Sequence, residues 1–270
     1  LAGGEVYDMP ILPEKNYLPD LKKIPSRIAK RAKLMFLNYP NNPTTTVVED
    51  LSFFKEVVGF AKKYDIIVCH DFAYSELTFD GYKPPSFLQI RGAKDVGVEF
   101  HTFSKTYNMA GWRLGFCVGN REILRPLEEL KSYLDYGVFT PIQLSGVLAL
   151  SASQKCVQDV VAEYKRRRDK FVDGLNRIGW KVDRPKATMY IWARLPEKFE
   201  GMSSLQFAEL LIERTGIAVA PGVGFGSYGE GFVRMALVTH YDRFHDALLR
   251  LKKFLREGPP GRSGGRVGRG

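Results

Sequence analysis

The sequence predicts an α/β fold: a mixed, mostly parallel sheet with helices on both faces, followed by a smaller α+β C-terminal domain. Two short apolar runs, residues 34–37 and 65–70, bracket residues 49–64, whose apolar side chains recur at helical spacing. A strand, a helix and a second strand in this order form a crossover unit with parallel strands. The run 65–70 is apolar along most of its length, which is typical of a sheet covered on both faces.

Two further strands are predicted at residues 98–103 and 113–118. Only nine residues separate them. This link is too short for a crossover helix, so we expect the second of these strands to run antiparallel to the others. Helical patterns then cover residues 121–134, 141–153 and 155–178.

The C-terminal region reads as a separate, smaller domain that is entered through the long helix. Its predicted strands are residues 188–194, 217–220 and 232–238, and its predicted helices are residues 203–214 and 241–256. We therefore place a large domain at residues 1–164, a small domain at residues 165–257 and a flexible tail at residues 258–270. The tail is rich in Gly, Pro and Arg and contains no acidic residue.

The charge balance is basic, with 40 Lys and Arg against 30 Asp and Glu and a formal net charge of +10. This excess permits either a nucleic acid or an anionic substrate and does not choose between them. Three of the arginines lie in the tail, and a dense cluster from Lys165 to Lys170 falls in a helical pattern, where we expect a solvated helix face. The sequence contains no zinc-finger or basic-zipper pattern, so it does not favour nucleic acid as a partner.

Cysteine usage and hydropathy exclude several other classes of protein. Cys69, Cys117 and Cys156 are widely spaced and form no C-x-x-C pair, so we expect reduced, buried thiols in a cytoplasmic protein. The four histidines form no metal-binding motif. No apolar run is long enough to span a membrane, and no secretory signal is visible. We therefore expect neither a metal nor a membrane partner.

Polar side chains follow the parallel strands at the edge of the sheet where those strands end, and ligands of open α/β sheets bind beyond this edge. These side chains carry an amide, a carboxylate, a phenol, a hydroxyl, an amine and a guanidinium. The residues are Asn42, Asp71, Tyr74, Ser104, Lys105 and Arg113. Taken singly, each has an ordinary explanation, such as a turn at Asn42 or a helix N-cap at Asp71. Their convergence on one edge predicts a binding site.

Three motifs at this edge resemble those of a known enzyme family. The segment from Ser104 to Gly115 (SKTYNMAGWRLG) is similar to the pyridoxal-phosphate lysine motif of the class I/II, fold type I, aminotransferases. The segments NYPNNPT, from Asn38, and HDFAY, from His70, resemble the two other motifs of that family in the same order and spacing. The resemblance covers residues 1–256 and is greatest to the LL-diaminopimelate aminotransferases.

The resemblance implies pyridoxal 5′-phosphate as the cofactor and assigns roles to the residues of the edge. Lys105 would hold the cofactor through a covalent imine bond and, once freed, move the proton at the substrate Cα. Asp71 would keep the pyridine nitrogen protonated, which makes the ring an electron sink. The other roles implied are hydrogen bonds to the ring oxygen from Tyr74 and Asn42 and binding of the phosphate by Ser104 and Arg113.

A further implied site residue lies in the small domain. Arg234, in the segment FVRMAL, matches the family's arginine that binds the substrate α-carboxylate by a two-pronged ion pair. Asn42 would also contact the substrate. The glycines Gly222, Gly224 and Gly226 do not open the helix that a nucleotide-binding loop needs. We therefore expect a mobile loop in front of Arg234.

The implied function is a PLP-dependent aminotransferase that moves an amino group between an amino acid and a 2-oxo acid. One interpretation is LL-diaminopimelate with 2-oxoglutarate in lysine biosynthesis. The alternatives are another specificity (aspartate, alanine or aromatic) or a C–S lyase. Both stay open because the same lysine can support different reactions of the carbanion that forms at the substrate Cα. A remote hypothesis is a non-catalytic binding protein on the same fold, which the positive charge alone supports. The family also implies a homodimer in the cytoplasm.

Two features depart from the family pattern. Thr45 stands where the family commonly has glycine, and it would be strained if this position requires a positive φ. The chain opens at Leu1 without the family's N-terminal part, which carries sheet strands, a phosphate loop and an aromatic residue that stacks on the cofactor ring. We therefore expect an N-terminally truncated large domain, poorly soluble and inactive as a 270-residue chain.

Overall fold

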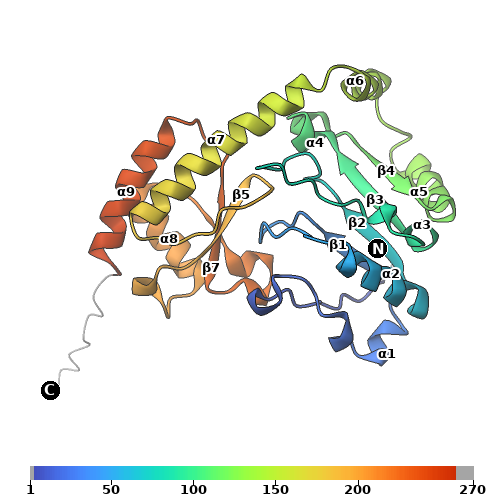
Figure 1. The fold of residues 1–270 in the computed structure, drawn as a ribbon, viewed down its shortest axis with the longest axis horizontal. Coiled ribbons are helices and arrows are strands. Elements are labelled where there is room, and N and C mark those ends of the chain that lie inside the picture. The colour runs from blue at the N-terminus through green and yellow to red at the C-terminus, as the bar shows by residue number, and fades with distance from the viewer. Residues whose placement is uncertain (1–2, 260–270) are drawn as a thin grey trace. The chain divides into compact units, whose positions relative to one another are not determined.

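The computed structural model describes residues 3–259, and the chain divides into two compact units (Figure 1). The first unit comprises Leu1–Arg168 and Arg184–Ile191, and the second comprises Asp169–Asp183 and Trp192–Gly270. From residue 260 onward, the predicted tail lies outside the described residues. The chain therefore leaves the first unit, returns to it for eight residues and leaves it again.

A four-stranded sheet in the order β1-β2-β3-β4 forms the centre of the first unit. Its strands are β1 (Leu34–Asn38), β2 (Ile67–Asp71), β3 (Gly97–Thr102) and β4 (Gly115–Gly119). The first three strands are parallel, and β4 runs antiparallel to β3. The predicted α/β class with a mostly parallel sheet and the predicted direction of the fourth strand are both confirmed.

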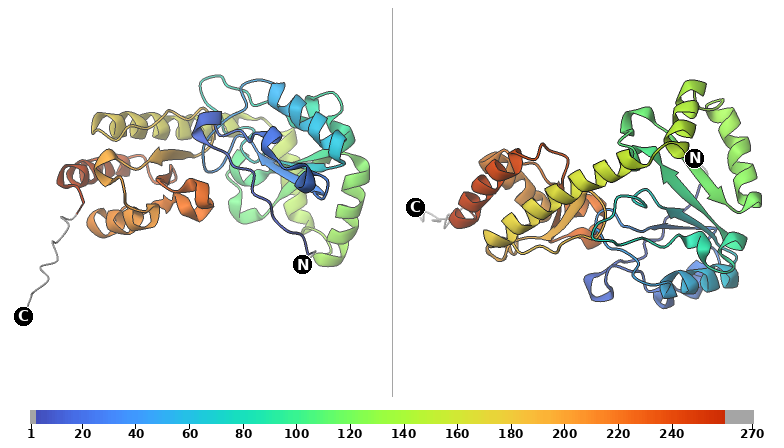
Figure 2. Two further views of the ribbon diagram at one scale, coloured as in Figure 1. Left: turned by 90° about the horizontal axis from the view of Figure 1, so that it is seen from below. Right: turned by 45° about the horizontal axis from the view of Figure 1, so that its top comes forward.

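The longer helices of the chain's first 177 residues lie close to their predicted positions. They are α2 (Ser52–Tyr64), α5 (Arg121–Leu134), α6 (Thr140–Ser151) and α7 (Lys155–Arg177). The short helical turns are η1 (Pro13–Lys15), η2 (Leu21–Lys23), α1 (Ser26–Ala29), η3 (Phe87–Gln89), α3 (Ala93–Val96), α4 (Phe103–Thr106) and η4 (Ala110–Trp112). Figure 2 shows α7 as a long, straight helix after α6, and it contains the residues at which the chain leaves the first unit.

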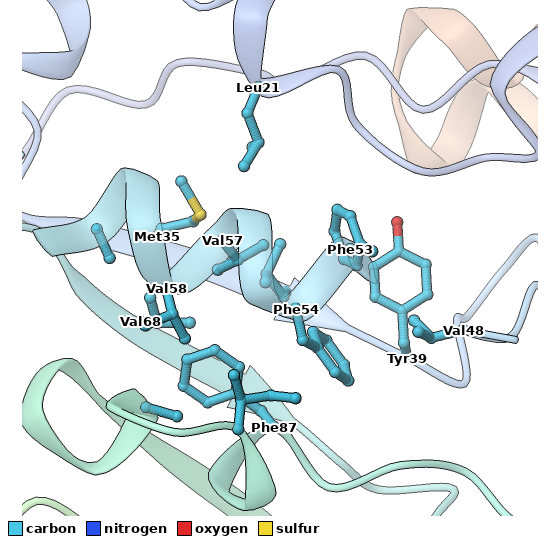
Figure 3. Packing of buried hydrophobic residues seen from close by; sticks show 14 of the residues in the cluster. Leu21, Met35, Tyr39, Val48, Phe53, Phe54, Val57, Val58, Val68 and Phe87 are labelled. Atoms are coloured by element: carbon cyan, nitrogen blue, oxygen red, sulfur yellow. The ribbon is translucent and has the colours of Figure 1, made fainter. Parts of the chain in front are cut away.

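Helix α2 covers one face of the sheet because its apolar residues share one side. Phe54, Val57 and Ala61 are fully buried there. Phe54 packs edge-to-face on Phe87 with ring centroids 5.7 Å apart (Figure 3). Burial of such a side chain contributes about 2–3 kcal/mol. The helix ends where Asp65 adopts a left-handed conformation and donates its backbone N–H to the carbonyl of Ala61.

Several apolar side chains of the first unit remain exposed. On the face of β1 opposite the buried Met35, the side chain of Phe36 is 67% exposed. Helix α5 contains no buried residue, and Leu148 of α6 is also 67% exposed. Large apolar surfaces of this kind mark interaction sites or surfaces that another part of a protein covers.

The basic cluster of α7 is the expected solvated helix face only in part, because Arg166 is exposed while Arg168 is not. Arg168 is almost fully buried, and its guanidinium donates to Asp80 at 2.6 Å and to the carbonyl of Pro185 at 2.9 Å. Lys165 pairs with the other carboxylate oxygen of Asp80 at 2.7 Å. Hydrogen bonds from Arg168 and then Lys165 hold the pKa of Asp80 well below its usual range. Two charges of the cluster thus join segments of the first unit and are not arranged to face a polyanion.

The three cysteines differ in environment. Cys69 is buried as expected, Cys117 is half-buried, and Cys156 is exposed, so the prediction of a buried thiol is wrong for Cys156. Cys156 lies in the first turn of α7, on the solvent side. Burial raises the pKa of the Cys117 thiol to about 11. Among residues 3–259, no group of His, Cys, Asp and Glu side chains is arranged to hold a metal ion. In the same range, no helix is both long and apolar enough to cross a membrane.

The second unit is built on a small sheet in the order β5-β7-β6, of which Figure 1 labels β5 and β7. Its elements are β5 (Tyr190–Arg194), whose first two residues belong to the first unit, η5 (Glu197–Phe199), α8 (Ser204–Thr215), β6 (Ala220–Pro221), η6 (Gly222–Phe225), η7 (Ser227–Gly229), β7 (Phe232–Ala236) and α9 (Arg243–Glu257). The core contains Phe199 stacked on Phe254 at 4.8 Å and edge-to-face on Phe207. Of the predicted strand at 217–220, only Ala220 is in a strand. Strand β6 pairs Ala220 with Arg234 and Pro221 with Val233, and it ends where η6 begins at Gly222.

Candidate active site

The strand register brings the ends of β1 and β2 together at one edge of the first sheet. Asn38 pairs with Asp71, and Asp71 pairs with Phe100 of β3. The side chain of Asn38 connects two of the predicted site residues. Its Nδ2 donates to the backbone oxygen of Asp71 at 3.0 Å, and its Oδ1 accepts the backbone N–H of Asn42 at 2.8 Å. The predicted convergence of Asn42 and Asp71 thus has a direct structural basis.

The turn after β1 is fixed by its own hydrogen bonds. The buried Asn41 accepts the backbone N–H of Thr44 at 3.0 Å and its hydroxyl at 2.7 Å. The N–H of Thr45 donates to the carbonyl of Asn41 at 3.0 Å. The φ of Thr45 is 62°, a left-handed conformation that is strained for a β-branched residue. The expected conflict at Thr45 is therefore confirmed.

Asp71 is the last residue of β2 and Tyr74 comes three residues later, and the two lie in different environments. Asp71 is exposed, and its Oδ1 accepts the N–H of Ala73 at 3.1 Å. No helix begins after Asp71, so its ordinary explanation as an N-cap does not apply. Tyr74 is buried, and its hydroxyl lies 3.5 Å from the hydroxyl of Tyr190. Tyr190 belongs to the segment that returns to the first unit, which sequence reasoning did not connect with this site.

Ser104, Lys105 and Arg113 lie around the junction of β3 and β4. Ser104 and Lys105 are half-buried in α4, whose first turn begins at Thr102 with its hydroxyl accepting the N–H of Ser104 at 3.1 Å. Thr102 pairs with Gly115, so Arg113 comes two residues before the start of this pairing. Arg113 is exposed, and its Nη1 donates to the carbonyl of Ala110 at 2.9 Å. A hydroxyl, an amine and a guanidinium therefore stand at the same end of β3.

Arg234 belongs to the second unit and is described there by itself. It lies in β7, where Val233 and Met235 on either side are buried while Arg234 is half-buried on the other face of the strand. The Arg234 guanidinium carbon lies 4.5 Å from the centre of the Phe225 ring. The segment containing Phe225 forms η6 and η7, two consecutive turns with internal backbone hydrogen bonds. This packing does not support the mobile loop that we expected.

Sequence reasoning missed a buried polar network directly behind Asp71. Successive residues of a strand point to opposite faces, so His70 lies on the side of β2 away from Asp71, where it is fully buried. Its Nδ1 lies 2.9 Å from a carboxylate oxygen of Glu99, and its Nε2 lies 3.1 Å from the carbonyl of Tyr39. The network therefore fixes the strand that presents Asp71.

Glu99 is the centre of this network. It accepts the N–H of Phe87 at 2.6 Å and the hydroxyl of Ser86 at 2.8 Å, in addition to its contact with His70. Burial acts to raise the pKa of Glu99, but hydrogen bonds from His101, His70 and Ser86 lower it to about 2. A sign was present in the sequence, because a glutamate within an apolar strand needs a partner when it is buried.

The edge of the first sheet offers a set of groups that fits pyridoxal phosphate. An amine can bond an aldehyde carbon, an exposed carboxylate can bind a protonated ring nitrogen, and a guanidinium with a hydroxyl can bind a phosphate. These groups are Lys105, Asp71, Arg113 and Ser104. Asp71 ends β2, Ser104 and Lys105 follow β3, and Arg113 precedes β4. A site of this composition can hold a phosphorylated aldehyde and move a proton beside it.

Comparison with protein families gives a match over almost the whole chain. The family described as aminotransferase class I and II matches residues 1–247. The LL-diaminopimelate aminotransferase of Moorella thermoacetica is 51% identical over 255 residues, which cover 94% of this chain and 64% of that protein. The glutamate-pyruvate aminotransferase AlaC of Escherichia coli is 46% identical over 95% of this chain and 62% of that protein.

A solved structure is similar in fold as well as in sequence. The substrate-bound structure of BacF from Bacillus subtilis has a TM-score of 0.88 and 42% identity, with 92% of this chain and 63% of that chain covered. The chain thus spans a little less than two thirds of the length of the relatives that it matches.

Proposed function

This chain belongs to the class I and II aminotransferase family, and from that premise we propose that the whole protein is a pyridoxal-phosphate-dependent aminotransferase. The observation that carries the proposal is the joint placement of Asp71, Lys105 and Arg113 at one edge of the first sheet. A carboxylate, an amine and a guanidinium with these positions are the groups that the cofactor requires.

Pyridoxal phosphate, when bound, supplies an electron sink for negative charge at the substrate Cα. The residues of this chain would bind the cofactor and move the proton. Asp71 would accept a hydrogen bond from the ring nitrogen and hold its proton there. Tyr74 and Asn42 would hydrogen-bond the ring oxygen, and Ser104 and Arg113 would bind the phosphate. Lys105 would anchor the cofactor and then carry the proton away from the Cα as a general base.

The substrate is an amino acid, and Arg234 would bind its α-carboxylate through a bidentate ion pair. We propose LL-diaminopimelate as donor and 2-oxoglutarate as acceptor, in lysine biosynthesis, supported by the 51% identity to the Moorella enzyme. The 46% identity to a glutamate-pyruvate aminotransferase favours alanine and glutamate as the second candidate pair. A C–S lyase has no comparable support among these relatives.

The test is a substrate profile of the full-length protein loaded with pyridoxal phosphate. We expect transamination of LL-diaminopimelate with 2-oxoglutarate at a kcat/KM at least tenfold above that for alanine with 2-oxoglutarate, a preference of about 1.4 kcal/mol. The reverse order would select the second candidate. Pyruvate release from a cysteine conjugate without any 2-oxo acid would indicate a lyase. Salt-sensitive DNA retention without any transamination would instead support the non-catalytic binding protein.

We further propose that the full-length protein is a homodimer. The exposed apolar side chains of α5 and α6, including Leu148, support a surface that is covered in the assembly. Light scattering of the full-length protein should give twice the monomer mass, and Leu148→Glu should shift the equilibrium toward monomers. A wild-type protein that is monomeric at micromolar concentration would show that another part of the polypeptide covers these helices.

The two units would then have different roles. We propose that the first unit is the cofactor domain and that the second unit supplies the substrate arginine, in line with the predicted large and small domains. A location in the cytoplasm stays a prediction from cysteine usage.

A further inference from the structure

The face of the second sheet that carries Arg234 contains a continuous series of stacked aromatic and cationic groups. The guanidinium of Arg234 lies 4.5 Å above the ring of Phe225. Phe225 meets the indole of Trp192 edge-on at 6.0 Å, and Trp192 stacks on Phe232 at 5.2 Å with an interplanar angle of 5°. At the other end of the series, the guanidinium carbon of Arg194 lies 4.9 Å from the centre of the Phe232 ring. We call these five residues the aromatic ladder.

The ladder follows from strand alternation. Trp192 of β5 and Phe232 and Arg234 of β7 occupy alternate positions whose neighbours are buried against the helices. Phe225 is the one ladder member that does not come from a strand. It reaches the ladder from η6, so its position depends on how that turn is held.

The turn that carries Phe225 is held by close backbone packing and by a buried serine. Gly222 and Gly229 pack so tightly that a Cβ on either would collide with the carbonyl of the other. The N–H of Val223 donates to the hydroxyl of Ser204 at 3.1 Å, and Ser204 is fully buried. Glu230 accepts the N–H of Ser204 at 2.5 Å and its hydroxyl at 3.1 Å. Phe225 is thus presented by a rigid turn, although it is itself 39% exposed.

We propose that Phe225 is a positioning residue that orients the Arg234 guanidinium for two-pronged binding of a substrate carboxylate. A guanidinium lying over an aromatic face keeps all of its N–H donors in its own plane available for a carboxylate, while an aliphatic neighbour would let the plane rotate. Restricting that rotation before binding lowers the entropy cost of forming both hydrogen bonds. The inference rests on the role proposed for Arg234 and deepens it.

The test measures binding of maleate, a dicarboxylate without an amino group, to the full-length, cofactor-loaded protein by titration calorimetry. In Phe225→Leu the guanidinium would rotate freely before binding, and a cost of about 1 kcal/mol for fixing it should weaken maleate binding about fivefold. Phe225→Tyr retains the aromatic face and should bind within about twofold of wild type. Arg234→Ala should bind at least tenfold more weakly because it removes charge-assisted hydrogen bonds.

Tyr228→Leu is the matched control, because Tyr228 lies in η7, next to the same turn, is 54% exposed and has no ring contact with another described residue. It should bind maleate as wild type does, and the thermal midpoints of Phe225→Leu and Tyr228→Leu should agree within about 2 °C. Unchanged maleate affinity in Phe225→Leu, equal weakening in the control, or no maleate binding by wild type would each overturn the proposal. The transamination profile is scored separately, so an inactive protein that still shows the maleate pattern counts against the proposed function alone.

Discussion

The two sides of β2 carry polar groups of opposite character. Behind the strand, His70 and Glu99 are fully enclosed and every hydrogen-bonding partner is a protein group. In front, Asp71 is exposed and accepts one local N–H, and Arg113 at the same edge is exposed as well. The first set is satisfied within the fold and stabilises it. The second set is exposed, and under the proposed function it would bind the cofactor.

This comparison shows how two consecutive residues of one strand can have different roles. Strand alternation sends His70 and Asp71 to opposite faces, so a rigid network can hold the backbone of a residue whose side chain stays available. Substitutions behind β2 should therefore act on stability, and substitutions in front of it should act on activity. The following predictions test that division in order of decreasing effect.

The largest effect is expected for Lys105→Ala in the full-length protein. Removal of the amine takes away both the covalent anchor and the general base, so kcat should fall at least about 10³-fold. The visible absorbance of the bound cofactor should be lost as well. The free energy of unfolding of the cofactor-free protein should change by less than about 0.5 kcal/mol, measured by urea titration. Lys94→Ala, an exposed lysine of α3, is the control and should keep both activity and absorbance.

Glu99→Gln should show the opposite pattern. A neutral amide cannot accept from His70, Ser86 and the Phe87 N–H as the carboxylate does, so we expect a loss of about 3 kcal/mol in the free energy of unfolding. The folded fraction should keep a kcat within about threefold of wild type. Glu56→Gln, on the exposed face of α2, should leave the stability unchanged. If Glu99→Gln lost its kcat completely but kept wild-type stability, the assignment of stability to the residues behind β2 would be contradicted.

The same carboxylate predicts a dependence on pH. Its pKa is lowered in the fold to about 2, against about 4.3 in an unfolded chain. The stabilisation is therefore fully present above the unfolded pKa and is lost as the pH falls toward 2. Unfolding titrations between about pH 6 and 3 should show the difference between wild type and Glu99→Gln shrinking toward the acid end. A difference that stays constant over this range would exclude the ionised Glu99.

The smallest effect is expected for a substitution of Thr45, in the turn after β1. Its left-handed φ is unfavourable for a β-branched side chain, so Thr45→Gly should stabilise the protein by about 1 kcal/mol. The matched control is Thr46→Gly, whose backbone is not in the left-handed region, and it should destabilise by about 0.5–1 kcal/mol. Thermal unfolding of both variants measures the difference. Equal shifts for the two would show that the turn carries no strain at Thr45.

The sequence predicted the features that depend on local pattern and strand order. The positions of Asp71 and Lys105 followed from reading the residue after each parallel strand, and the antiparallel β4 followed from the length of one link. What it could not predict depends on long-range contacts. Burial of Arg168 requires Asp80, which lies 88 residues earlier in the chain, and no local periodicity carries that information.

The network around Glu99 was predictable from the sequence only in part. A glutamate in an apolar strand was visible, but its partners come from a neighbouring strand and from a loop turn, and pairing register had to be known to connect them. The two-residue length of β6 was also not predictable from hydropathy, because residues 217–219 are apolar and yet lie outside the pairing of Ala220 and Pro221 with β7.

The return of Arg184–Ile191 to the first unit has a consequence for how the protein can be divided. The chain passes between the units three times, after Arg168, Asp183 and Ile191. A single proteolytic cut at any one of these passages leaves at least one fragment that contains residues of both units. A fragment ending at Arg168 would lack Tyr190 beside Tyr74 and Lys186 beside Glu49. The two units are therefore not interchangeable modules. A gene split after Arg168 or Asp183 would leave the first unit without Tyr190, and a split after Ile191 would leave Asp169–Asp183 of the second unit attached to the first.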